Sequence, residues 1–346
     1  MKKQLTTLTR TDLEEWWERV PGARRFMKTL GDEAEKNRAA AIDISDEDTE
    51  DFISIFTEEV QRRNYLLVIE RLTLDGASAM NEFVTALAEH FEPSYLPDLL
   101  SGSLMADVAR KKILSGYVLI VKVPGRASWL TELISDFNRV EDVDKGALIF
   151  LTSELPAQFT FRLTDFVTPY DVQFFAINLL ETARLSQTEK LYTATLTAKL
   201  AKTSAVLTKN LSTPELYFDG ARLMEEVFGE EFNRRKFERA VWETQIQFAL
   251  PIVETVREKL IARNLFELKK LLPVTDEFGK TLSNPWDMEL RHLHYYGGKV
   301  KVFSQTDWDV LELVYRARND LSHLESIETD RLEKIFSLTE FCSSFD

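Results

Sequence analysis

The chain has 346 residues, of which 44% are hydrophobic and 29% charged, a composition typical of a globular protein with two or three domains. Its net charge of −14 excludes a protein that coats nucleic acid with its whole surface, because neutralising phosphates requires basic side chains, and it disfavours docking on anionic lipid. A local basic cleft, or a basic cleft formed across a dimer, stays compatible with this charge.

The first part of the chain alternates short apolar runs with amphipathic segments. Short apolar strands separated by helices are typical of βαβ units around a buried parallel sheet, so residues 1–180 are expected to form an α/β domain. The expected strands are 39–44, 65–72, 117–123, 146–153 and 159–166, and the expected helices are 11–38, 48–63, 79–91, 103–114 and 127–140.

The order of these elements raises the question of nucleotide binding. Neither GxxxxGK[ST] nor GxGxxG occurs, and the segment SDEDTED (45–51) stands where a phosphate loop would follow the first strand. Five carboxylates there would repel a triphosphate, and Val123-Pro124-Gly125 replaces the acidic residue that would hold magnesium. The domain resembles the P-loop/AAA-like ATPases of bacterial defence systems, without Walker motifs. We therefore expect a degenerate P-loop-like domain and no cofactor.

The rest of the chain is predicted to be helical. Residues 181–220 form a helical connector, made of helices at 171–185 and 187–209 and a loop at 212–220 that marks a boundary. Residues 221–346 are expected to form a helical bundle. Its four helices are 232–272, bent at Pro251; 286–296, stopped by Gly297-Gly298; 307–325, begun by a capping box of Thr306 and Asp309; and 329–342.

The third helix of this bundle contains the segment RARNDLSH, residues 316–323. At about 100° per residue, Asn319 and His323 share a face, Arg316 lies nearly in line with His323, and Arg318 is turned away by about 140°. A histidine can move the proton of a ribose 2′-hydroxyl, an arginine can hold the phosphate, and an asparagine can orient the imidazole. These residues suit RNA cleavage without a metal, which spares DNA.

Arg318-Asn319-Asp320-Leu321-Ser322-His323 resembles the Arg-x(4–6)-His motif of HEPN-superfamily ribonucleases, and Arg316 to His323 fits the longer spacing. The resemblance implies a HEPN-like bundle in a homodimer whose two motifs form one composite site. It also implies a role in bacterial defence or toxin systems. Arg316, Arg318, Asn319 and His323 are then the catalytic candidates, and RNA is the substrate.

A second interpretation of the same helix stays open. Arg316, Arg318, Asp320 and Glu325 would form a solvated face of weak ion pairs, and the chain would be a non-enzymatic regulatory or scaffold subunit of a defence complex with a protein partner.

Other candidate sites are less distinctive. Arg234, Arg235, Lys236 and Arg239 form a basic patch that could guide RNA, and Arg291 and His294 could line a neighbouring helix face. His292 and His294 point in different directions on a helix, and no further ligand completes a metal site. The single cysteine, Cys342, excludes an internal disulfide and a thiolate zinc cluster. With no signal peptide and no apolar run long enough to span a bilayer, we expect a cytoplasmic protein without a membrane association.

Overall fold

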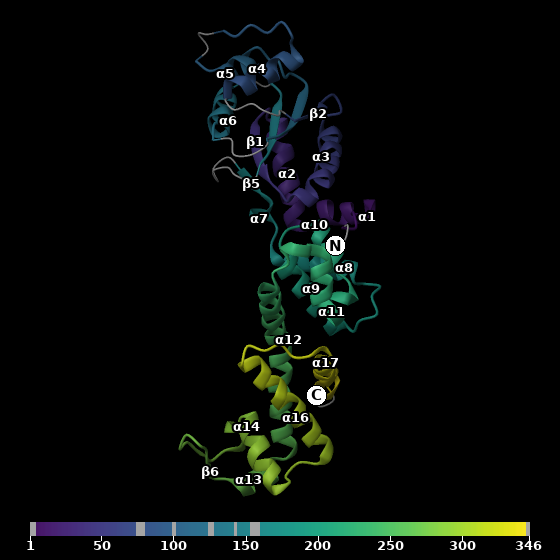
Figure 1. Ribbon diagram of the computed structural model, residues 1–346, viewed down its shortest axis with the longest axis vertical. Coiled ribbons are helices and arrows are strands. Elements are labelled where there is room, and N and C mark those ends of the chain that lie inside the picture. The colour runs from purple at the N-terminus through teal and green to yellow at the C-terminus, as the bar shows by residue number, and fades with distance from the viewer. Residues whose placement is uncertain are drawn as a thin grey trace. The chain divides into compact units, whose positions relative to one another are not determined.

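The computed structural model describes residues 5–73, 80–98, 102–123, 128–141, 144–152 and 160–343, with side chains up to 339. The chain divides into two compact units (Figure 1). One contains Leu5–Asn178 together with Ala201–Asn210, and the other contains Leu179–Leu200 and the chain from Leu211 onward. No helix in the described ranges is long and apolar enough to cross a membrane.

The first unit is built on a five-stranded sheet, and its expected α/β architecture is confirmed. Every strand pair is parallel, in the order β2-β3-β4-β1-β5. The strands β3 and β4 are buried almost throughout, as expected for a sheet covered on both faces. The strands are β1 (Ala39–Asp43), β2 (Val68–Thr73), β3 (Tyr117–Lys122), β4 (Ala147–Leu151) and β5 (Thr160–Arg162).

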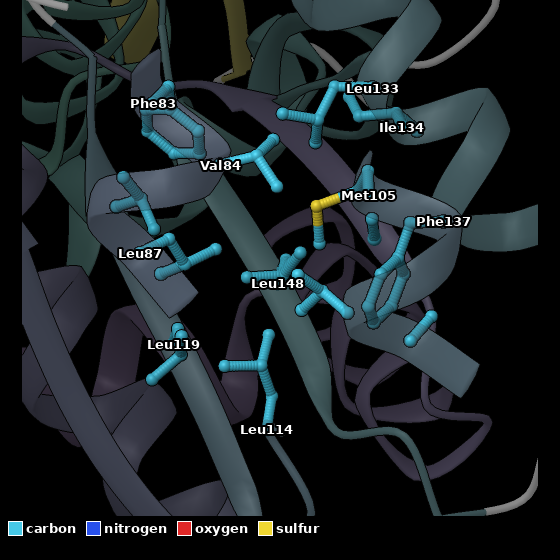
Figure 2. Close-up of a cluster of buried hydrophobic side chains, with 14 of the residues drawn as sticks. Phe83, Val84, Leu87, Met105, Leu114, Leu119, Leu133, Ile134, Phe137 and Leu148 are labelled. Atoms are coloured by element: carbon cyan, nitrogen blue, oxygen red, sulfur yellow. The ribbon is translucent and has the colours of Figure 1, made fainter. Parts of the chain in front are cut away.

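Helices cover both faces of this sheet. Phe83, Met105 and Phe137 come from three helices and pack on Leu119 and Leu148 of the central strands (Figure 2). The opposite face contacts α2, which packs on β1 and β4. The helices of this unit are α1 (Arg10–Glu14), the π-helix η1 (Glu15–Arg19), α2 (Pro21–Glu35), η2 (Asp46–Asp48), α3 (Thr49–Arg63), α4 (Met80–Phe91), α5 (Leu104–Arg110), α6 (Leu130–Arg139), α7 (Leu163–Phe166), α8 (Pro169–Leu179) and α10 (Ala205–Leu211).

Two expectations for this unit need correction. The predicted strand 159–166 continues only to Arg162, because the chain then turns into α7 and buries Leu163. The predicted helix 187–209 is interrupted at Lys202, which has a left-handed φ of 55°, so that α9 (Gln187–Ala201) and α10 are separate. The parts of the predicted elements at 79, 127, 153 and 159, and the Pro124-Gly125 pair after the strand at 117–123, lie outside the described residues.

The second unit is almost entirely helical. Helices α12, α16 and α17 pack on one another. Their shared core includes Val253, Val256, Leu311, Val314 and Ile335. The elements are α9, α11 (Pro214–Phe228), η4 (Gly229–Glu231), α12 (Arg234–Arg263), α13 (Leu265–Leu271), β6 (Val274–Thr275), β7 (Thr281–Leu282), η5 (Pro285–Asp287), α14 (Leu290–His292), the π-helix η6 (Leu293–Gly297), α15 (Gly298–Val300), α16 (Gln305–Ser322) and α17 (Thr329–Ser343).

Several predicted boundaries are wrong in this unit. The loop expected at 212–220 is helical from Pro214, which occupies the first turn of α11, where a missing N–H costs nothing. A break remains within the expected loop, because the backbone of Asp219 leaves helical geometry (φ −147°, ψ 54°) and kinks α11. Gly297-Gly298 does not stop a helix: a Cβ on Gly297 would lie 2.2 Å from the Phe303 ring, so this glycine permits close packing. Helix α16 is capped by Ser304, whose hydroxyl accepts a hydrogen bond from the Asp307 N–H, rather than by Thr306.

Candidate functional site

Helix α16 carries the segment RARNDLSH, and its apolar stripe decides which way that segment faces. Leu311, Val314, Ala317 and Leu321 are buried at spacings of three and four residues. The polar residues therefore lie on the other faces. The helix ends at His323, whose exposed side chain follows the last turn and whose backbone N–H donates to the Asn319 carbonyl at 3.1 Å.

The two arginines of the segment contact different neighbours. Arg316 is exposed and binds the Glu312 carboxylate through Nε at 2.7 Å and Nη2 at 2.6 Å. Arg318 is exposed and lines a recess of about 260 Å³, which also involves Arg257 and residues 286–290. The half-buried Asn319 directly follows Arg318 in the sequence. The predicted motif is thus present on one helix, with its guanidinium groups separated.

Other polar residues of the helix form local contacts. Asp320 forms an ion pair with Arg331 of α17, and the Ser322 hydroxyl donates to the Arg318 carbonyl at 2.6 Å. Through both contacts, polar side chains at the end of α16 bind protein groups rather than water alone.

A carboxylate that the sequence did not single out joins two of the predicted site residues. Glu312 accepts from Arg316 and also lies 2.6 Å from Nε2 of His294. The His294 ring stacks on Tyr315 at 4.4 Å and on Trp308 at 5.0 Å. Burial alone would raise the pKa of Glu312, but the hydrogen bonds from His294 and Arg316 lower it. Glu312 is therefore ionised at neutral pH.

Arg291 and His292, also in the predicted helix 286–296, are engaged by neighbouring residues of the same chain. Arg291 lies within 3.7 Å of the carboxylates of Asp276, Glu277 and Glu289. His292 is buried, and its Nδ1 accepts from the Glu289 N–H at 3.0 Å. Burial lowers the pKa of His292, which keeps it neutral. Arg291 is thus engaged within the chain.

The basic patch at the start of α12 faces a groove. Arg235 and Arg239 line this groove, which has a volume of about 760 Å³. Arg234 instead pairs with Glu238 at 3.2 Å, and Lys236 is exposed on the first turn, where Asn233 caps the helix. We call the groove the α12 groove; its lining residues are Arg235, Glu238, Arg239, Trp242, Leu324, Glu325 and Ser326.

The sequence analysis did not identify Trp242 and Leu324 of the α12 groove as site residues. Trp242 follows Arg235 by seven residues and Arg239 by three, a spacing that places the three on one helix face. This spacing was an available signal for Trp242. Leu324 comes from a segment 82 residues after Trp242, so only the packing of α16 on α12 brings it to the groove.

The α/β unit lacks the features of a phosphate site at the end of β1. Asp48 is 1% exposed, and its carboxylate accepts from the Ser45 hydroxyl at 2.6 Å and from the Val206 N–H at 2.9 Å. Burial raises the pKa of Asp48 to about 6. This carboxylate binds the start of α10, and its charge disfavours an anionic ligand. Within the described ranges, no group of three or more His, Cys, Asp or Glu side chains is arranged to hold a metal.

Comparisons with known proteins give few matches. No protein-family model and no curated protein matches the chain. Five chains of solved structures match, among them one titled "Structure of Rhizobiales Trip13". That chain is 14% identical, with a TM-score of 0.36, and the alignment covers 69% of this chain and 97% of the other. A TM-score this low carries no inference about fold or activity.

Proposed function

We propose that this chain is a metal-independent endoribonuclease of HEPN type that acts as a homodimer in a cytosolic defence or toxin system. One observation carries the proposal. The exposed His323 ends α16, and the next residue, Leu324, lines the α12 groove together with Arg235 and Arg239. The backbone thus runs from His323 directly into the wall of a groove lined by two arginines, and a histidine with arginines supplies the chemistry needed beside a phosphodiester.

In the proposed reaction, His323 takes the proton of a ribose 2′-hydroxyl. The 2′-oxygen attacks the adjacent phosphorus, the bond to the 5′-oxygen breaks, and a proton passes to that leaving oxygen. The products are a 2′,3′-cyclic phosphate and a 5′-hydroxyl, and no metal is required. Arginine stabilises the charge that develops on the phosphorane.

The separation of the two arginines supports a site made from two copies. Arg318 faces its own recess and Arg316 is bound to Glu312, so a single chain does not gather the motif around one phosphate. In a dimer, Arg318 of one copy would complete the site at His323 of the other. The α/β unit is proposed to be a degenerate P-loop-like domain that senses a partner protein.

The direct test is incubation of the purified chain with total RNA and tRNA in EDTA. We expect wild-type protein to cut RNA and leave 2′,3′-cyclic phosphates, and His323→Ala and Arg318→Ala each to lower the rate about 100-fold or more. Mixing the two variants should restore part of the activity, because one composite site per heterodimer keeps both groups. The matched controls are His90→Ala and Arg222→Ala, which remove exposed side chains elsewhere.

A non-enzymatic scaffold or regulatory subunit is the second candidate, favoured by the engagement of Arg316 with Glu312. Intact RNA with all variants, with and without lysate of phage-infected cells, would support this role. Cleavage that persists in His323→Ala would rule out the proposed site.

A further inference from the structure

The α12 groove contains an aromatic ring that is fixed in place. The Trp242 Nε1–H donates to the Leu321 carbonyl at 2.9 Å, and Leu321 lies in the last turn of α16. This hydrogen bond holds the indole in one orientation while the side chain stays half-exposed. A ring that is already ordered loses little further freedom when a ligand stacks on it.

The groove has a second apolar lining residue, Leu324. Leu324 is 71% exposed and has a left-handed φ of 63°, a backbone conformation that is uncommon for leucine. The wall continues with Glu325 and Ser326. An exposed leucine and a fixed indole in the same groove offer apolar contacts for a flat ligand.

The cations of the groove lie along the same face as the ring. Arg239 pairs with Glu243 at 2.9 Å, and both side chains are exposed enough for water to weaken this pair. Arg235 lies one turn earlier. Glu238 and Glu325 also line the groove, so the two guanidinium groups are nearly balanced and charge alone would not hold a polyanion there.

We propose that the α12 groove binds single-stranded RNA, with an unpaired base stacked on Trp242 against Leu324 and the neighbouring phosphates on Arg235 and Arg239. Stacking is needed because the charges of the groove nearly cancel, and only unpaired bases expose a face for it. The inference rests on the proposed function for its choice of RNA, and it adds that the substrate is unpaired where it is bound.

The test uses the full chain and a fluorescein-labelled decamer of 2′-O-methyluridine, which lacks the attacking 2′-hydroxyl, with binding followed by fluorescence anisotropy in EDTA. We expect Trp242→Ala to weaken binding about 10- to 100-fold and Trp242→Phe to weaken it less, because a ring remains. Arg235→Ala and Arg239→Ala should each weaken binding and reduce the slope of log K against log salt by about one.

Two matched controls lie elsewhere in the same unit. Phe266→Ala removes an exposed aromatic ring outside the groove, and Arg222→Ala removes an exposed guanidinium of α11; neither should change the affinity. Melting temperatures of all variants show whether the chain remains folded.

Three results would overturn the inference: no binding of the decamer by wild-type protein, unchanged binding by Trp242→Ala, or equal binding of an RNA duplex. Competition by poly-glutamate with no dependence on Trp242 would point to an acidic protein partner and would overturn it too. If the decamer binds through Trp242 but RNA is never cut, the RNA-binding proposal for the α12 groove is supported and the ribonuclease proposal fails. If RNA is cut and Trp242→Ala has an unchanged KM for RNA, the RNA-binding proposal for the α12 groove fails and the ribonuclease proposal survives.

Discussion

At the scale of single residues, Glu312 shows how one side chain changes the interpretation of its neighbours. Arg316 and His294 were separate candidates in the sequence, yet both bind this carboxylate. An arginine bound to a carboxylate must release it before it can hold a phosphate in the same way. Arg318, which has no comparable short contact to an acid among the described residues, is therefore the better candidate for phosphate binding.

Asp48 gives a prediction about pH. Its folded-state pKa of about 6 exceeds the ordinary value of 3.8, so the folded protein holds this proton more tightly than the unfolded chain. The contribution of Asp48 to stability is fully present below pH 3.8 and is lost as the pH rises to about 6, a loss of about 3 kcal/mol. We expect Asp48→Asn to remove this pH dependence from the free energy of unfolding, measured in urea at pH 4.5, 5.5 and 7.

The control for this prediction is Asp46→Asn, which changes an exposed carboxylate in the same acidic segment. Its free energy of unfolding should follow the wild-type pH dependence. If Asp48→Asn also tracks the wild type between pH 4.5 and 7, the buried carboxylate does not titrate in this range.

At the scale of secondary structure, the helix α12 is joined to the segment before α17 by one amide. The Gln245 Nε2–H donates to the Ile327 carbonyl at 2.8 Å, and its Oε1 accepts from the Ile327 N–H at 2.7 Å. Both groups are buried, so removing the amide leaves a donor and an acceptor unpaired. We expect Gln245→Ala to lower the free energy of unfolding by about 2 to 4 kcal/mol, measured by urea denaturation.

Gln247 offers a matched comparison two residues along the same helix, because its side chain is exposed. Gln247→Ala should change the free energy of unfolding by less than about 0.5 kcal/mol. Equal effects of the two substitutions would show that the Ile327 contact contributes nothing.

The elements that the sequence predicted best are those with a clear apolar pattern. The strands β3 and β4 and the helix α16 lie within a few residues of their expected bounds. Their buried residues can be recognised in the sequence as continuous apolar runs or as apolar residues at helical spacing. Proline and glycine were misleading. Pro214 begins a helix and Gly297 permits contact with Phe303, and each role depends on neighbours that the local sequence does not reveal.

The candidate site was predictable only in part for the same reason. The side chains of RARNDLSH and of the basic patch could be identified from residue type and spacing. Their partners could not, because Trp242 and Leu324 come to line one groove, and His294 binds Glu312, only after segments distant in sequence have packed.

At the scale of the whole molecule, the acidic segment after β1 predicts that the chain does not use ATP. A buried Asp48 and four further carboxylates between residues 46 and 51 disfavour a triphosphate. We expect the melting temperature to stay unchanged in millimolar Mg-ATP and calorimetric titration to show no heat of binding. A rise in melting temperature that depends on ATP concentration would contradict this expectation.

The path of the chain through its two units has a consequence for biosynthesis. Residues 201–210 complete the α/β unit, where Val206 binds Asp48, Lys209 binds Asp12 and the Asn210 side chain pairs with the backbone of Thr6. A ribosome that has made only the five strands has therefore not yet supplied the last piece of the unit that contains them. About forty further residues must be made before the Val206 N–H can reach the buried Asp48, so the first unit to be translated closes only once the second has begun.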